Sequence, residues 1–178
     1  NIGDDAGEMG TSMVAVDFGY NKATAVAVNY RHSCAILDNG NVVCWGANDH
    51  GQLGRGDREQ IGDEAGEMGV NLKQLDFGAQ RSVVQIAPAV AHTCARLDNG
   101  EVKCWGDGGD GRLGLENTDD QLSPPSTSID FGASRTAKAL SADGDHTCAI
   151  LNDDAVVCWG RNTNGQLGVG STTNVGEG

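Results

Sequence analysis

Apolar and polar residues alternate in the same short pattern at three places along the chain. Each copy consists of two alternating runs on either side of a polar turn, and the copies occupy residues 32–46, 92–106 and 146–160. Alternation with a period of two around a short turn is typical of two antiparallel strands. Each copy is therefore predicted to form a β-hairpin.

The turn of each hairpin is predicted to contain three residues. In the first copy Asp38 and Asn39 can bond their own backbone, and Gly40 can take the left-handed conformation that such a loop needs. In the third copy Asp154 stands at the glycine position. We expect it to adopt the same conformation at some energetic cost, because aspartate tolerates it better than most residues.

All six cysteines lie in the hairpins, and the three-residue loop sets their register. Counting outward from the turn pairs Cys34 with Cys44, Cys94 with Cys104, and Cys148 with Cys158. Directly opposed residues have Cα atoms about 4.5–5.5 Å apart, which a disulfide can span. Three hairpin disulfides are predicted. Buried free thiols stay open as an alternative, as does a zinc site that includes His32, although no fourth ligand has a fixed spacing.

Two further apolar segments precede each hairpin, so each unit is expected to contain four strands. The first kind ends in Asp-Phe-Gly and the second leads into the hairpin; they occupy 13–19, 72–78 and 126–132, and 24–28, 82–87 and 136–141. The hairpins recur after 60 and then 54 residues, counted from the first cysteine of each. Such a period predicts an all-β propeller-like array. The array spans 1–178, with units near 1–59, 60–119 and 120–178.

Charge and composition exclude several classes of function. The net charge is −13, from 12 basic and 25 acidic residues, which argues against a nucleic-acid partner. No apolar run is long enough to cross a membrane. No nucleophile, base and orienting group are recognisable as a set, so no enzymatic activity is expected. Regularly paired cysteines indicate an oxidising compartment, and we expect an extracellular or cell-surface location.

Two acidic, glycine-rich segments, at 1–10 and 60–69, are predicted to be solvated connectors. Several carboxylates on a flexible loop also suit calcium, so calcium stays open as an alternative there. No other cofactor is expected.

A glycine-rich tail follows each hairpin, reading Gly-Ala-Asn-Asp-His-Gly-Gln-Leu-Gly at 46–54 and Gly-Arg-Asn-Thr-Asn-Gly-Gln-Leu-Gly at 160–168. Together with the hairpins, these tails resemble the repeat family named for the regulator of chromosome condensation. The second tail departs from the pattern at Asp107, Gly108 and Arg112. The resemblance implies β-propeller blades, usually seven of four strands each, and a protein-binding role. The paired cysteines resemble a secreted or surface branch, so the nucleotide exchange activity of the founding member is not expected here.

These observations favour a non-enzymatic scaffold or a self-assembling, filament-forming subunit. The segment 13–18 is expected to complete a blade outside this chain and the last blade to lack a strand, so units would pair head to tail. The segment would then be part of a larger propeller or of an open assembly, and its partners would be copies of itself or further repeats.

The alternative is a module that binds a protein through the loops that differ between repeats. The residues expected to contact such a partner are Asn48, Asp49, His50, Asp107, Asp110, Arg161, Asn162 and Asn164.

Overall fold

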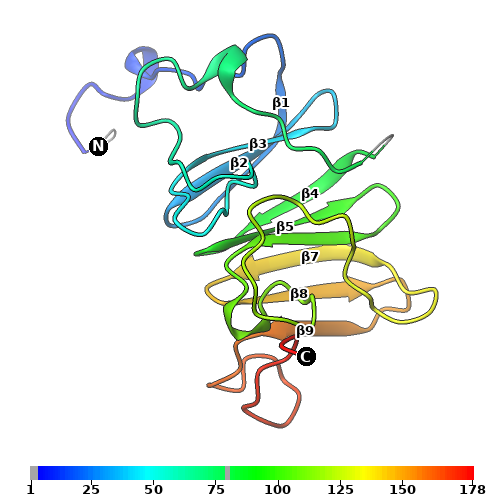
Figure 1. The fold of residues 1–178 in the computed structure, drawn as a ribbon. Coiled ribbons are helices and arrows are strands. Elements are labelled where there is room, and N and C mark those ends of the chain that lie inside the picture. The colour runs from blue at the N-terminus through cyan, green and yellow to red at the C-terminus, as the bar shows by residue number, and fades with distance from the viewer. Residues whose placement is uncertain (1–3, 79–80) are drawn as a thin grey trace.

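The computed structural model describes residues 4–78 and 81–178, so the first three residues of the acidic N-terminal segment lie outside it. The described residues form three antiparallel sheets of three strands each, and consecutive sheets lie side by side (Figure 1). The strands are β1 Ala23–Val28, β2 His32–Leu37 and β3 Val42–Gly46; β4 Val83–Pro88, β5 His92–Leu97 and β6 Val102–Gly106; and β7 Ala137–Asp143, β8 His146–Leu151 and β9 Val156–Gly160. Short 3-10 turns occupy η1 Gly10–Ser12, η2 Gly69–Asn71 and η3 Gly109–Gly111.

The three hairpins have the register expected from the sequence. Cys34 lies opposite Cys44, and the corresponding cysteines are opposed in the other two sheets. All three pairs are disulfide-bonded, with Cα atoms 4.1 Å apart. All six cysteines are therefore in disulfides, which leaves no thiolate for the zinc site considered above and no free thiol.

The hairpin turns also have the expected backbone. Gly40 has φ +81°, and Asp154 has φ +67° at the equivalent position. The left-handed conformation costs a residue with a Cβ atom more than it costs glycine.

We therefore expect Asp154→Gly to stabilise the protein by about 0.5–1 kcal/mol, because relief of this conformation outweighs the extra freedom of glycine in the unfolded chain. Asp154 also forms an ion pair with Lys138, but its side chain is 86% exposed, so little is lost with the pair. Urea unfolding of the variant would measure the change. The control is Asn99→Gly in the second hairpin turn, where Gly100 already has the left-handed conformation. This variant should show no gain in unfolding free energy.

The expected fourth strand is wrong as a full strand. Of the segment 72–78 only Leu75 pairs with a sheet, through an antiparallel bridge to Val42 at the start of β3. The equivalent Ile129 donates one hydrogen bond, 2.9 Å long, to the Val102 carbonyl. Each segment then leaves the sheet edge, because Asp-Phe-Gly turns back through a hydrogen bond from the Gly N–H to the aspartate, as between Gly78 and Asp76.

The second and third Asp-Phe-Gly segments each join two consecutive sheets. Leu75 is hydrogen-bonded to the first sheet, whereas Phe77, two residues later, packs against Trp105 of the second with ring centroids 5.6 Å apart. Phe131 makes the same contact with Trp159 in the third sheet, at 5.9 Å. With the leucines and valines around them, these aromatic pairs belong to two hydrophobic clusters, one at the junction of the first and second sheets and one at the junction of the second and third.

The two outer faces of the array expose residues that are buried between sheets. Val26 on β1 is 66% exposed, whereas Ile86 and Leu140 occupy the same position of β4 and β7 and are 7% and 5% exposed. At the other end Val156 of β9 is 66% exposed, and its counterparts on β3 and β6 are fully buried. Each outer face thus presents the half of an interface that the inner sheets complete with a neighbour.

Within the described residues, the helices are only single 3-10 turns, and none could span a bilayer.

Candidate functional site

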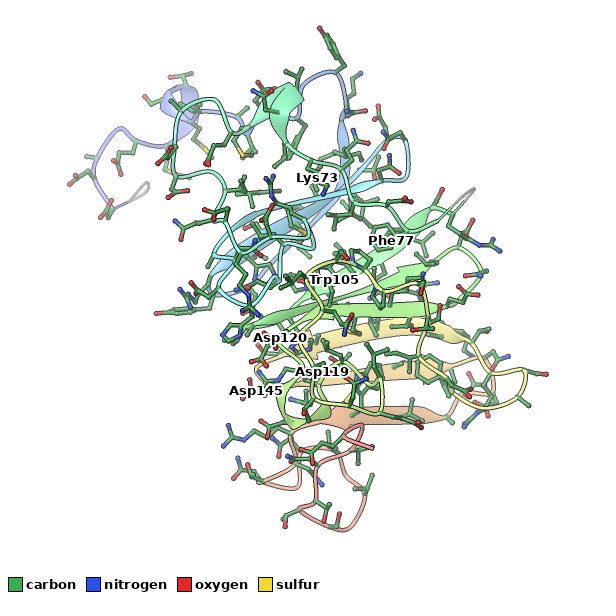
Figure 2. All side chains as sticks on the ribbon, viewed as in Figure 1. Lys73, Phe77, Trp105, Asp119, Asp120 and Asp145 are labelled. Carbon is green, nitrogen blue, oxygen red and sulfur yellow. A yellow bond between two sulfur atoms is a disulfide. The ribbon has the colours of Figure 1, made fainter. Side chains whose placement is uncertain are left out.

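Most charged pairs that link the repeats lie at one end of the sheets, opposite the hairpin turns. This end is built from the turns before β2, β5 and β8 and from three tail loops, residues 47–61, 107–121 and 161–175, which leave β3, β6 and β9 and return to their last residues. Asp119, Asp120 and Asp145 mark this end in Figure 2. We call the following side chains the charged rim: Arg31, Asp49, His50, Arg58, Asp107, Asp110, Arg112, Asp120, Asp145 and Arg161.

Two of the residues expected to contact a partner instead hold the tail loops together. Asn48 is 1% exposed; its amide donates to the Asp57 and Glu59 carbonyls and its oxygen accepts from the Leu53 N–H. Asn162 is fully buried and does the same in the third loop. Buried amides of this kind satisfy backbone groups that a loop would otherwise leave unpaired. The prediction that these two side chains face a partner is therefore wrong.

The other residues of that prediction lie at the surface of the rim. Asp49 forms an exposed ion pair with Arg31, 2.8 Å long. Asn164 is exposed, and its backbone N–H donates to Gln166. His50, Asp107 and Asp110 are partly exposed, and Arg161 pairs with Asp145 at 3.2 Å.

Ion pairs of the rim cross from each repeat to the next. Arg58 of the first loop reaches Asp120 of the second at 2.8 Å. Arg112 lies among three carboxylates: Asp107 and Asp110 of its own loop, each at 3.1 Å, and Asp145 of the third repeat at 2.8 Å. With 9% of its side chain exposed, Arg112 is held more firmly than a surface ion pair.

Sequence reasoning missed five members of the rim: Arg31, Arg58, Arg112, Asp120 and Asp145. The signal was present in the second tail, where Arg112 replaces the glutamine found at Gln52 and Gln166. A buried arginine needs carboxylates around it.

Beneath the rim, buried side chains connect successive sheets in the same way at both junctions. His32 Nε2 lies 2.8 Å from Thr93 Oγ1, and that hydroxyl donates its proton to the Gln52 carbonyl. His32 Nε2 therefore carries the proton and donates it to Thr93. At the second junction His92 Nε2 lies 2.9 Å from Thr147 Oγ1. A tryptophan also links each junction: Trp105 Nε1 donates to the Gln52 carbonyl at 3.0 Å in the first, and Trp159 Nε1 donates to the Arg112 carbonyl at 3.1 Å in the second.

The buried histidines predict that acid destabilises the protein. Burial lowers the pKa of His32 to about 4; burial, and then the charge of Arg112, lower the pKa of His92 to about 3. Below about pH 6.5 the two histidines are protonated in the unfolded chain but stay neutral in the folded chain. Their contribution to stability is therefore complete above that pH and is lost as the pH falls toward the lowered pKa values.

We expect the unfolding free energy to fall by up to about 2–3 kcal/mol per pH unit between pH 6 and 5, where carboxylates contribute less. Urea unfolding at a series of pH values would measure this slope. In His32→Asn the slope should drop by about half, and an unchanged slope would contradict the assignment.

Carboxylates of the rim and of an acidic connector are held ionised by their neighbours. Burial acts to raise the pKa of Asp120, but the Gly108 N–H and the Arg58 guanidinium outweigh it and keep that pKa below its usual value. In the connector at 60–69 the Glu64 and Gly62 N–H groups bond the Glu67 carboxylate and lower its pKa. Backbone amides thus already occupy the carboxylate at the centre of that segment, and calcium binding there stays a prediction.

Comparisons with known proteins agree with this architecture. Residues 23–52, 90–112 and 138–166 match the family described as "Regulator of chromosome condensation (RCC1) repeat". The chain is similar to the Ultraviolet-B receptor UVR8 of Arabidopsis thaliana, with 36% identity over 85% of this chain and 32% of the receptor. It is also similar to the human E3 ubiquitin-protein ligase HERC2, with 28% identity over 91% of this chain and 3% of the ligase. The chain thus spans a third or less of these relatives.

Solved structures show the same fold. Human WBSCR16 superposes with a TM-score of 0.70 and 26% identity, over 86% of this chain and 38% of that protein. Yeast RCC1 (Prp20), in complex with Kap60, superposes with a TM-score of 0.70 and 18% identity, over 87% of this chain and 36% of that protein. The matched segments contain the three hairpins, and the sheets resemble the blades of these propellers. Three segments of the chain, one in each sheet, thus match the RCC1 repeat.

Proposed function

We propose that the chain is a non-enzymatic, protein-binding part of a propeller and that the charged rim is its contact surface. The observation that carries the proposal is the difference between the two ends of the sheets. The three hairpin turns keep one length and one backbone conformation, whereas the rim loops differ in sequence and only the first and third share the frame built on a buried asparagine.

Charges of both signs on this frame favour a protein partner over a polyanion. Arg31, Arg58 and Arg161 are each about half exposed, and aspartates stand beside them. Alternating charges of this kind give specificity and fast association with a complementary protein surface. Among the relatives, yeast Prp20p has been studied for its binding to Gsp1p and histones, which supports a protein partner here. Disulfides in every repeat support an oxidising location, extracellular or at the cell surface.

Charge reversal on the rim tests this function. The double variant Arg58→Glu and Arg161→Glu changes two exposed rim positions, and Arg81→Glu changes an arginine of similar exposure that pairs with Asp98 at the hairpin-turn end. In quantitative affinity capture, we expect the wild type and Arg81→Glu to bind proteins that the rim variant does not bind. Identical captured sets for all three proteins would reject the rim as the contact surface.

A second function, end-to-end assembly as a scaffold, is favoured by the outer faces. Val26 exposes the position that Ile86 and Leu140 bury between sheets, and Val156 does so at the opposite end. At the outer edge of β9 the Val156 carbonyl corresponds to those of Val42 and Val102, which accept hydrogen bonds from the next segment. The two faces are thus complementary halves of one interface, and the occupant they fit is another repeat of this type, in the same chain or in a copy.

Mass per particle measured by light scattering tests assembly between copies. We expect the mass of the wild type to rise with concentration. Val26→Arg and Val156→Arg should each have the mass of one chain. Val84→Arg, at a position 46% exposed on β4 of the middle sheet, serves as the control. A single-chain mass at every concentration in the wild type would reject assembly between copies.

A further inference from the structure

We propose that His50, Asp107 and Asp120 form a binding site for a divalent transition-metal cation at the junction of the first and second repeats. The three residues come from two tail loops. His50 belongs to the first loop, and Asp107 and Asp120 lie near the beginning and end of the second. Imidazole and carboxylate together are the ligand set that zinc and similar cations accept.

The three side chains converge without bonding one another directly. His50 Nδ1 lies 3.9 Å from Asp107 Oδ2 and 3.8 Å from Asp120 Oδ2, and all three ligand atoms lie within 4.8 Å of one another. Within the described residues the His50 ring makes no hydrogen bond, because both distances exceed the hydrogen-bond range. Ligands of a tetrahedral zinc ion lie about 3.4 Å apart, given metal–ligand distances near 2.1 Å. Small side-chain movements would therefore close the site around a cation.

The second junction provides an internal comparison. Its equivalent positions, counted from the bridges that close each loop, hold Asp110, Arg161 and Asn174. Asn174 donates a hydrogen bond 3.0 Å long to Asp110, and the arginine adds a positive charge. The same place in the fold is thus closed by a hydrogen bond at one junction and lined at the other by three possible ligand atoms that make no hydrogen bond to one another.

Neighbouring groups hold the two carboxylates in position. Arg112 contacts Asp107 Oδ2 at 3.1 Å, and Arg58 contacts Asp120 Oδ2 at 2.8 Å. Each carboxylate oxygen has two lone pairs, so it can accept from a guanidinium and bind a cation together. Such outer contacts orient ligands, as partners of metal-bound carboxylates do. The two guanidinium charges also oppose a cation, so we expect moderate affinity, with water in the fourth position.

Titration with Zn²⁺, followed by calorimetry on the oxidised chain after chelator removal, tests the site. The wild type is expected to bind one Zn²⁺ per chain, and His50→Asn to bind at least tenfold more weakly. Asp49→Asn removes the adjacent carboxylate that pairs with Arg31 and should bind like the wild type. X-ray absorption of the zinc complex should show nitrogen and oxygen ligands at about 2.0–2.2 Å and no sulfur at about 2.3 Å.

The variant His50→Asp, Asp107→Arg, Asp120→Asn carries the residues of the second junction and should bind no Zn²⁺ while keeping the wild-type circular dichroism. Equal affinity in the wild type and His50→Asn, sulfur in the absorption spectrum, or binding of Ca²⁺ but not Zn²⁺ would each overturn the proposal. None of these readouts involves a protein partner, so the result is independent of the function proposed for the rim.

Discussion

Replacing Trp105 by alanine should lower the unfolding free energy by about 3–5 kcal/mol, the usual cost of removing a large aromatic side chain from a core. Trp105 is fully buried between the first two sheets. The change removes its edge contact with Phe77 and its hydrogen bond to the Gln52 carbonyl, which leaves that buried acceptor with fewer partners. Urea unfolding followed by circular dichroism would measure the loss.

Trp45→Ala is the matched control, because Trp45 occupies the same position in the first repeat. Its ring contacts Phe18, but it is only partly buried since no described sheet precedes it. We expect its removal to cost clearly less than that of Trp105. Equal losses would show that the tryptophans stabilise their own hairpins and contribute little between repeats.

Removing the central disulfide, as Cys94→Ala with Cys104→Ala, should lower the unfolding free energy by about 2–3 kcal/mol. The bond joins residues 10 apart in sequence, and closing a loop of that length restricts the unfolded chain by about this amount. Both cysteines are fully buried, so the lost packing of the sulfurs adds to the effect. Denaturant unfolding of oxidised protein gives the comparison.

The third disulfide separates these two contributions. Cys148 and Cys158 are also 10 residues apart, but they are only partly buried in the last sheet. The loop contribution is the same, so Cys148→Ala with Cys158→Ala should cost less by the packing contribution alone. A greater loss than that of the central pair would contradict this division.

The sequence predicted what depends on residues close together along the chain. The hairpins, their register and the opposed cysteines follow from alternation and one three-residue turn, and Asp154 takes the backbone expected of it. The fourth strand was wrong because its pairing depends on a neighbouring sheet edge, where only Leu75 and Ile129 reach a partner.

The site was predicted only in outline for the same reason. The tail loops were identified, yet Asn48 and Asn162 turn inward because the loop backbone needs their amides. The cross-repeat contacts of Arg58 and Arg112 join residues far apart in sequence, which no local pattern indicates.

Because of the second and third Asp-Phe-Gly segments, a repeat of the sequence does not coincide with one sheet of the structure. Leu75 belongs by sequence to the second repeat, but its backbone completes the first sheet, and Phe77 immediately locks the second. A repeat that is added or removed therefore takes with it both contacts of the junction: the backbone bond to the preceding sheet and the phenylalanine that packs on its own tryptophan. The array can therefore become longer or shorter by whole repeats while these contacts between neighbouring sheets stay the same.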